Sequence, residues 1–204
     1  MYINHQYKFI FVHVPKTGGS AVHIAFKDFF NVIDRSNPPP DEHHASLEKI
    51  ISDNSHMDDI CEYFSFAFVR NPWARLLSGF CGFQQIRRKI TDIDFKSFVR
   101  NIHSGSGDYS NLIEDIHFKP QHLFVDSVDY IGRTENLEGC FEEVTSRLGI
   151  PKLPLNTAKP GSFIENIHRS TIHKPYREMY DNYTRDAVAD MYKEDIKRFD
   201  YKYE

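Results

Sequence analysis

The fold is decided by the stretch Phe9-Ile10-Phe11-Val12-His13-Val14-Pro15-Lys16-Thr17-Gly18-Gly19-Ser20. An apolar run ends at a proline, and a lysine, two glycines and two hydroxyl residues precede an apolar helical pattern. This order predicts a strand, an anion-binding loop and a helix. The glycines let backbone N–H groups turn toward one point, the helix adds the positive end of its dipole, and the lysine adds a full charge. We therefore expect a phosphate or a sulfate to bind here.

The length and the cysteine content limit the kind of protein this can be. The 204 residues are expected to form one domain, residues 1–204, which buries roughly 70% of the surface that the unfolded chain exposes. The cysteines Cys61, Cys81 and Cys140 are odd in number and widely spaced, which argues against a disulfide framework and against a zinc site. The sequence therefore predicts a reducing compartment and no metal site.

The net charge and the hydropathy of the sequence argue against a nucleic-acid-binding protein and against a membrane-spanning protein. The net charge of -4 argues against nucleic-acid binding by bulk electrostatics, so an anion site has to be local. No stretch approaches the ~20 apolar residues of a membrane span, and the N-terminus lacks the basic and apolar regions of a signal peptide. These features predict a cytoplasmic protein without an integral membrane segment.

Strand and helix patterns alternate along the chain. Buried strands are expected at residues 7–14, 63–69 and 130–132, because their apolar residues are nearly continuous. Helices are expected from the loop to about residue 31, at 46–51 with Ser46 as N-cap, from Pro72, and at about 94–102, 137–148 and 185–198, the last capped by Thr184. The pattern predicts an α/β fold with a central parallel sheet flanked by helices.

A second group of polar residues follows the second predicted strand. Arg70 lies at the carboxyl end of this strand, Asn71 is a good N-cap, and Pro72 occupies the first helical position. Ser78 falls on the same helix side as Asn71 and Arg75 by i, i+4, i+7 spacing. Ligands of open parallel sheets bind at this end of the strands. Each residue alone has an ordinary alternative, since a lone arginine commonly pairs with a carboxylate and a helix serine bonds its own backbone.

The motifs together resemble one enzyme family. The loop is not the G-x-x-x-x-G-K-[ST] loop of nucleoside triphosphatases, because Lys16 precedes the glycines. With Arg70-Asn71-Pro72 and Ser78 it resembles the cytosolic-fold sulfotransferases, in particular the carbohydrate type that includes heparan 2-O and chondroitin sulfotransferases. Residues 129–137 resemble that family's D-[FY]-I-G-R-x-E-N-L segment, and the closing Tyr192-x-x-Asp195-Ile196-x-x-Phe199-x-Tyr201 pattern continues the likeness.

The resemblance implies a P-loop-like sulfotransferase fold and a donor, 3′-phosphoadenosine 5′-phosphosulfate (PAPS). The segment that holds the 5′-phosphosulfate matches Pro15, Lys16, Thr17, Gly18, Gly19 and Ser20. Arg70 and Ser78 match the pair that holds the 3′-phosphate, and Arg133 matches a residue near the 3′-phosphate or the adenine. A salt bridge between Arg133 and Glu135 is an equally good interpretation of that segment. Lys16 is expected to stabilise charge on the bridging oxygen of the leaving phosphate, with no metal required.

An acceptor hydroxyl needs a general base, whose contribution is typically 10²–10⁴-fold. His43 and His44 are the candidates, because they lie on an irregular segment just before a helix. His44 matches the family better, since Ala45 and Ser46 follow it. The alternatives are that both histidines are solvent-exposed loop residues, or that His13 is the base, although its strand position predicts packing in the core.

The leading hypothesis is a PAPS-dependent transferase that sulfates a hydroxyl-bearing acceptor, expected to be a saccharide or glycoconjugate, by in-line displacement. One alternative is a nucleotide-binding module that binds the product 3′-phosphoadenosine 5′-phosphate (PAP) without catalysis. Another is a kinase with an unusual phosphate loop, which is disfavoured by the lysine position. Neither the acceptor nor an oligomeric state follows from the sequence.

Overall fold

A computed structural model describes residues 2–30, 44–56, 59–85, 90–155 and 175–204. The chain divides into two compact units, the first made of residues 1–69 and 121–156 and the second of residues 70–120 and 157–204. Each unit has its own hydrophobic core. The expectation of one domain over residues 1–204 stays a prediction.

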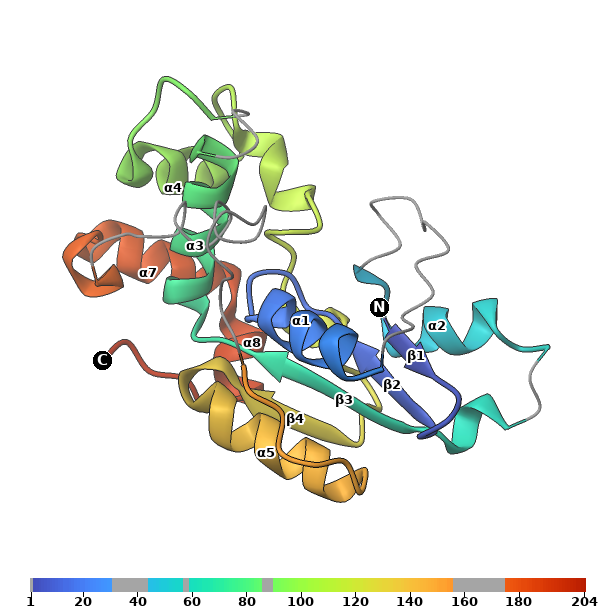
Figure 1. Ribbon diagram of the computed structural model, residues 1–204. Coiled ribbons are helices and arrows are strands. Elements are labelled where there is room, and N and C mark those ends of the chain that lie inside the picture. The colour runs from blue at the N-terminus through green and yellow to red at the C-terminus, as the bar shows by residue number, and fades with distance from the viewer. Residues whose placement is uncertain (1, 31–43, 57–58, 86–89, 156–174) are drawn as a thin grey trace. The chain divides into compact units, whose positions relative to one another are not determined.

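The first unit is built on a four-stranded sheet with the strand order β1-β2-β3-β4 (Figure 1). Its strands are β1 (Tyr2–Asn4), β2 (Phe9–Val12), β3 (Phe64–Val69) and β4 (Tyr130–Arg133). The three strands β2, β3 and β4 are parallel, as predicted, and β2 is shorter than the predicted range 7–14. The sheet as a whole is mixed, because β1 pairs antiparallel with β2.

The predicted central parallel strands are therefore present, and the antiparallel edge strand β1 was not predicted. A tight turn reverses the chain between β1 and β2, where the Tyr7 N–H donates to Asn4 Oδ1 at 2.8 Å and Lys8 adopts a left-handed φ of 48°. An antiparallel neighbour needs only such a turn, whereas a parallel one needs a long crossover. The strand β1 has only three residues, all half-buried, and so short a segment shows no recognisable hydrophobic periodicity in the sequence.

Two helices of the first unit cover the same face of the sheet. They are α1 (Gly19–Phe30) and α5 (Leu137–Arg147). Their apolar residues join the phenylalanines of the strands in one core of ten buried residues: Phe9, Phe11, Val22, Ala25, Phe26, Phe66, Phe68, Phe141, Val144 and Ile150. The unit also contains α2 (Leu47–Asp53) and short 3-10 turns at Ile60–Glu62, Gln121–Leu123 and Thr134–Asn136. Ser46 is the N-cap of α2, as predicted.

The described part of the second unit is helical. Its helices are α3 (Pro72–Gln85), α4 (Phe95–Ser104), α7 (Asn182–Met191) and α8 (Lys193–Arg198), with 3-10 turns at Ser110–Glu114 and Tyr176–Glu178. Pro72 begins α3, and Asn71 Oδ1 accepts the Trp73 N–H at 3.1 Å, so both predictions for this helix start are confirmed. The core is aromatic; Phe118 packs on Phe83 at 4.9 Å between ring centroids.

The predicted final helix at 185–198 was wrong in two respects. It is two helices, because Tyr192 between them has a non-helical backbone with φ -117° and ψ 28°. The first of them, α7, is capped by Asp181, not by Thr184. Thr184 is the third residue of the helix, and its hydroxyl accepts the Asp181 N–H at 2.9 Å in a reciprocal capping box.

Candidate functional site

The loop for which the sequence predicts anion binding, called the anion loop below, runs in the first unit from the end of β2 to the start of α1. Its backbone turns through left-handed conformations at Lys16, with φ 69°, and at Gly18, with φ 83°. The Gly18 carbonyl then accepts the Ala21 N–H at 2.9 Å, which closes the first turn of the helix. Such turns bring successive N–H groups toward a common concave side, where an anion binds.

The side chains of the loop divide into structural and chemical ones. Thr17 is 1% exposed and its hydroxyl donates to the Val14 carbonyl at 2.9 Å, so only its backbone N–H can serve a ligand. Pro15 is buried, whereas Lys16 and Ser20 are half-buried. The first turn of α1 contains no acidic residue, so its positive dipole end is not neutralised within that turn. Cationic charge and backbone donors are therefore concentrated at the loop.

Both glycines of the loop are required by their surroundings. A Cβ on Gly18 would lie 2.7 Å from Leu137 Cδ2, in addition to the strain of its positive φ. A Cβ on Gly19 would lie 2.0 Å from the His13 ring. The side chains around the loop thus occupy the space that any larger residue would need.

His44 lies three residues before the start of α2 and contacts His13 at the start of the loop. Its Nδ1 is 2.9 Å from the His13 carbonyl oxygen, and the two imidazole centroids are 4.6 Å apart. A carbonyl only accepts, so Nδ1 carries the proton, and a neutral His44 ring then has its lone pair on Nε2. His13 follows the last residue of β2 and is half-buried, which differs from the expected packing in the core. His43 lies outside the described residues.

Thr134 connects the loop to the carboxyl ends of the strands, and the sequence analysis did not assign it a role. It follows the last residue of β4, and its hydroxyl is 2.9 Å from the Thr17 carbonyl oxygen and 3.0 Å from that of Val69. The sequence contained one signal for this role. Thr134 is a hydroxyl residue that directly follows the predicted strand at residues 130–132 and Arg133. Arg133 is opposite Val69 in the β4–β3 register and is exposed.

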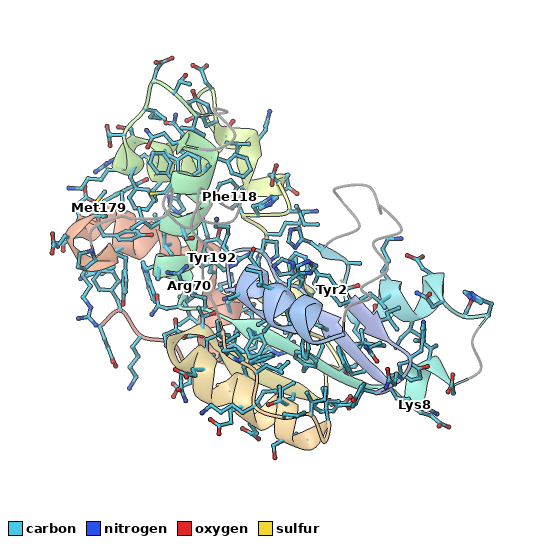
Figure 2. The ribbon with its side chains drawn as sticks, in the orientation of Figure 1. Tyr2, Lys8, Arg70, Phe118, Met179 and Tyr192 are labelled. Carbon is cyan, nitrogen blue, oxygen red and sulfur yellow. The ribbon has the colours of Figure 1, made fainter. Side chains whose placement is uncertain are left out.

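Arg70 and Ser78 belong to the second unit. Arg70 is half-buried, and Ser78 in α3 is 3% exposed. Arg75, one turn before Ser78, is buried and donates to the Lys119 carbonyl at 2.8 Å. Burial lowers the pKa of Arg75, Tyr192 and Asp195 raise it, and the positive charge of Arg70 lowers it again. The positive charge of Arg70 therefore acts on Arg75 within the second unit, to which the buried Tyr192 also belongs; Figure 2 labels Arg70 and Tyr192.

The predicted site residues thus fall into two groups. The first unit contains the loop residues 15–20 and His44, which contacts His13 just before them, with Arg133 at the end of β4, the strand beyond β3. The second unit holds Arg70 and Ser78. No described helix has both the length and the apolar character that crossing a membrane requires.

Comparison with known proteins gives the chain a family context. The profile described as "Sulfotransferase family" matches residues 1–202. An uncharacterized protein of Archaeoglobus fulgidus is 29% identical over 109 residues, which are 50% of this chain and 82% of that protein. No solved structure matches the chain significantly.

Proposed function

The chain belongs to the sulfotransferase family, and from this we propose that it transfers a sulfuryl group from PAPS to a hydroxyl group of a saccharide acceptor. The observation that carries the proposal is the loop of the first unit. It combines Lys16, two glycines that their neighbours require and the start of α1. His44, whose Nδ1 donates to the His13 carbonyl, lies beside it. An anion cradle next to a proton acceptor suits group transfer to a hydroxyl.

The donor fits the residues of the chain. PAPS would supply the sulfuryl group and carries anionic groups at both ends of an adenosine. We propose that Lys16, Ser20 and the N–H groups of residues 17–19 hold its phosphosulfate, with Pro15 fixing the start of the loop. Arg70 would hold the 3′-phosphate, since its planar guanidinium can donate two hydrogen bonds at once, and Ser78 would add a hydroxyl. Arg133 is proposed to lie near the nucleotide.

The chemical roles follow from charge and protonation. Lys16 would stabilise negative charge that develops on the leaving phosphate, so that most of the catalysis is positioning and charge stabilisation. His44 Nε2 would take the proton of the acceptor hydroxyl, because the hydrogen bond to the His13 carbonyl keeps the ring proton on Nδ1. His43 stays a second candidate for the base.

Titration calorimetry with PAP tests donor binding. We expect the wild type to bind and Lys16→Ala and Arg70→Ala each to lose at least tenfold in affinity, since hydrogen bonds to charged groups are worth about 1.5–3 kcal/mol. Lys152→Ala and Arg185→Ala are the matched controls, because these exposed side chains pair with Glu142 and Asp186 instead. A wild type that does not bind PAP, or variants that bind as the controls do, would contradict the proposal.

An acceptor screen with sulfur-labelled PAPS tests the reaction itself. We expect labelled product with hydroxyl-bearing saccharides and none with ATP replacing the donor. PAP binding without transfer to any acceptor of a broad panel would instead favour the module that binds nucleotide without catalysis. Phosphoryl transfer from ATP would favour the kinase alternative.

A further inference from the structure

We infer that Thr134 is a positioning residue for the anion loop, and that its hydroxyl sets the direction of the Thr17–Gly18 peptide so that the Gly18 N–H faces the bound anion. The inference rests on the proposed function, because it concerns the loop that would hold the phosphosulfate. It starts from one contact: Thr134 Oγ1 lies 2.9 Å from the Thr17 carbonyl oxygen. The hydroxyl is the donor in this pair, since a carbonyl oxygen only accepts.

The direction of the Gly18 N–H follows from peptide geometry. In a planar trans peptide the C=O and the following N–H point to opposite sides of the chain. Because the Thr17 carbonyl points at Thr134, the Gly18 N–H points away from Thr134. Gly18, which directly follows this peptide, has a left-handed φ of 83°, a conformation that glycine adopts without steric cost.

The same hydroxyl connects the loop to the sheet. Its oxygen is also 3.0 Å from the carbonyl oxygen of Val69, the last residue of β3, so one proton is shared between two acceptors. Val69 and Arg133 are register partners, which places Thr134 directly beyond the paired strand ends. The loop is therefore fixed to the rigid end of the parallel strands.

The other side of Thr134 supports the same arrangement. Its methyl carbon would lie 3.8 Å from a Cβ built on Gly18, and Leu137 Cδ2 would lie closer still. Thr134 and Leu137 thus form an apolar backing behind Gly18. The Thr17 hydroxyl does not make this link, since it donates within the loop to the Val14 carbonyl.

Three variants separate positioning from general stability. Thr134→Val keeps the shape and removes the hydroxyl, and Thr134→Ser restores the hydroxyl without the methyl group. Thr145→Val is the control, because Thr145 is a buried threonine of the same unit, whereas Thr134 is half-buried, and the Thr145 hydroxyl donates to a helix carbonyl, that of Glu142, at 3.0 Å. We expect Thr134→Val to lose at least tenfold in PAP affinity and in kcat/KM for the donor, with kcat less affected, and Thr134→Ser to stay within about threefold of the wild type.

Equal PAP affinities of Thr134→Val and Thr145→Val would overturn the inference, and so would a PAP affinity of Thr134→Ser as low as that of Thr134→Val.

A measurement without ligand separates a failure of this inference from a failure of the proposed function. The Ala21 amide donates to the Gly18 carbonyl, so its hydrogen exchange reports how well the loop is held. We expect faster exchange at Ala21 in Thr134→Val than in Thr145→Val or Thr134→Ser. Unchanged exchange would overturn the positioning role even if the wild type binds no PAP.

Discussion

The hydrogen bond from His44 to the His13 carbonyl determines which ring nitrogen can accept a proton. If His44 is the base, His44→Ala should lower kcat by 10²–10⁴-fold and leave PAP affinity within about threefold of the wild type. His44→Asn is the informative second variant, since its amide can still donate to the His13 carbonyl but supplies no base. Steady-state kinetics together with calorimetry measure the two effects. Normal turnover in His44→Asn would show that another residue is the general base, and His43 would be the next residue to replace.

The contact between His13 and Gly19 yields a prediction about coupled substitutions. Gly19→Ala should destabilise the protein by about 1–3 kcal/mol, because the added Cβ would lie 2.0 Å from the His13 ring. In a His13→Ala background the three atoms nearest to the added Cβ are absent, so the same change should be neutral or stabilising, as alanine favours a helix more than glycine does.

Urea unfolding of the four proteins measures this coupling free energy, which we expect to exceed 1 kcal/mol. Additive effects of the two substitutions would show that the His13 ring does not limit residue 19.

At the scale of elements, helix starts were predictable where the capping residue directly precedes an apolar run. Ser46 and Asn71 are such cases, and both accept N–H groups of the helices that follow them. The start of α7 was misplaced because Thr184 is also a good capping residue and stands three positions after Asp181. The sequence contains both members of the capping box, and only the backbone conformation distinguishes the cap from the third residue.

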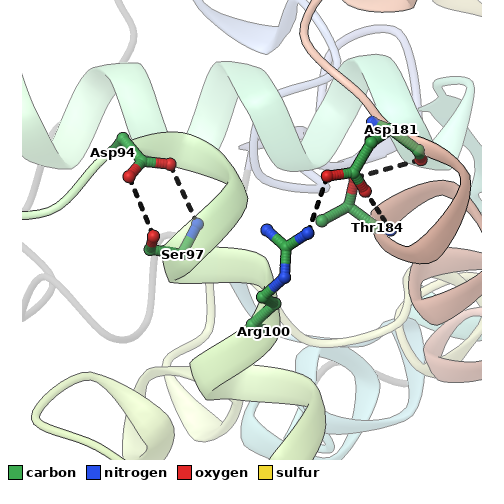
Figure 3. Close-up of polar contacts among 5 residues, drawn as sticks. All are labelled: Asp94, Ser97, Arg100, Asp181 and Thr184. Carbon is green, nitrogen blue, oxygen red and sulfur yellow. Dashed lines mark hydrogen bonds and ion pairs between the residues drawn. The ribbon is translucent and has the colours of Figure 1, made fainter.

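The cap of α7 is also an ion-pair partner of α4 (Figure 3). Asp181 accepts the Thr184 N–H at 2.8 Å, and Arg100 donates to the same carboxylate at 2.7 Å. Both contacts favour the ionised form, so the pKa of Asp181 lies well below its usual value, first because of the Thr184 backbone and then because of Arg100. This stabilisation is present above the unfolded-state pKa of about 3.9 and fades as the pH falls below it.

Asp181→Ala should therefore lower the free energy of unfolding by about 0.5–2 kcal/mol at pH 7, the usual range for a lost N-cap. The difference from the wild type should narrow as the pH falls below about 4, the unfolded-state pKa of the carboxyl, which urea titrations at several pH values measure. Asp186→Ala is the control on the same helix, because that carboxylate is exposed and pairs with its neighbour Arg185. A difference independent of pH would indicate that the ionised carboxylate is not what stabilises the helix start.

For the whole molecule, the sequence predicted the elements better than their assembly. The apolar runs in the sequence predicted the parallel strands β2, β3 and β4. The glycine pair directly after the first apolar run predicted the loop between β2 and α1. The antiparallel β1, the division into two units and the link from Thr134 to Thr17 depend on contacts between segments far apart in the chain. Local periodicity contains no information about which distant carbonyl a hydroxyl reaches.

The two units make the donor proposal testable by unfolding. Trp73 is the only tryptophan in the sequence and is buried in the core of the second unit, so its fluorescence reports that unit. The amides of β3 report the first unit. PAP at 100 times its Kd should stabilise the protein by about 2.7 kcal/mol, which for a chain of this size raises Tm by roughly 5–10 °C.

We expect both probes to show this rise, because the proposal assigns donor-binding roles to residues of each unit, Lys16 in the first and Arg70 and Ser78 in the second. Lys152→Ala should leave the rise unchanged, and Arg70→Ala should reduce it at both probes. A rise in the β3 amides without one in Trp73 fluorescence would mean that the loop binds PAP while Arg70 and Ser78 do not. The 3′-phosphate would then need another partner, and Arg133, at the end of β4 in the first unit, would be the next residue to replace.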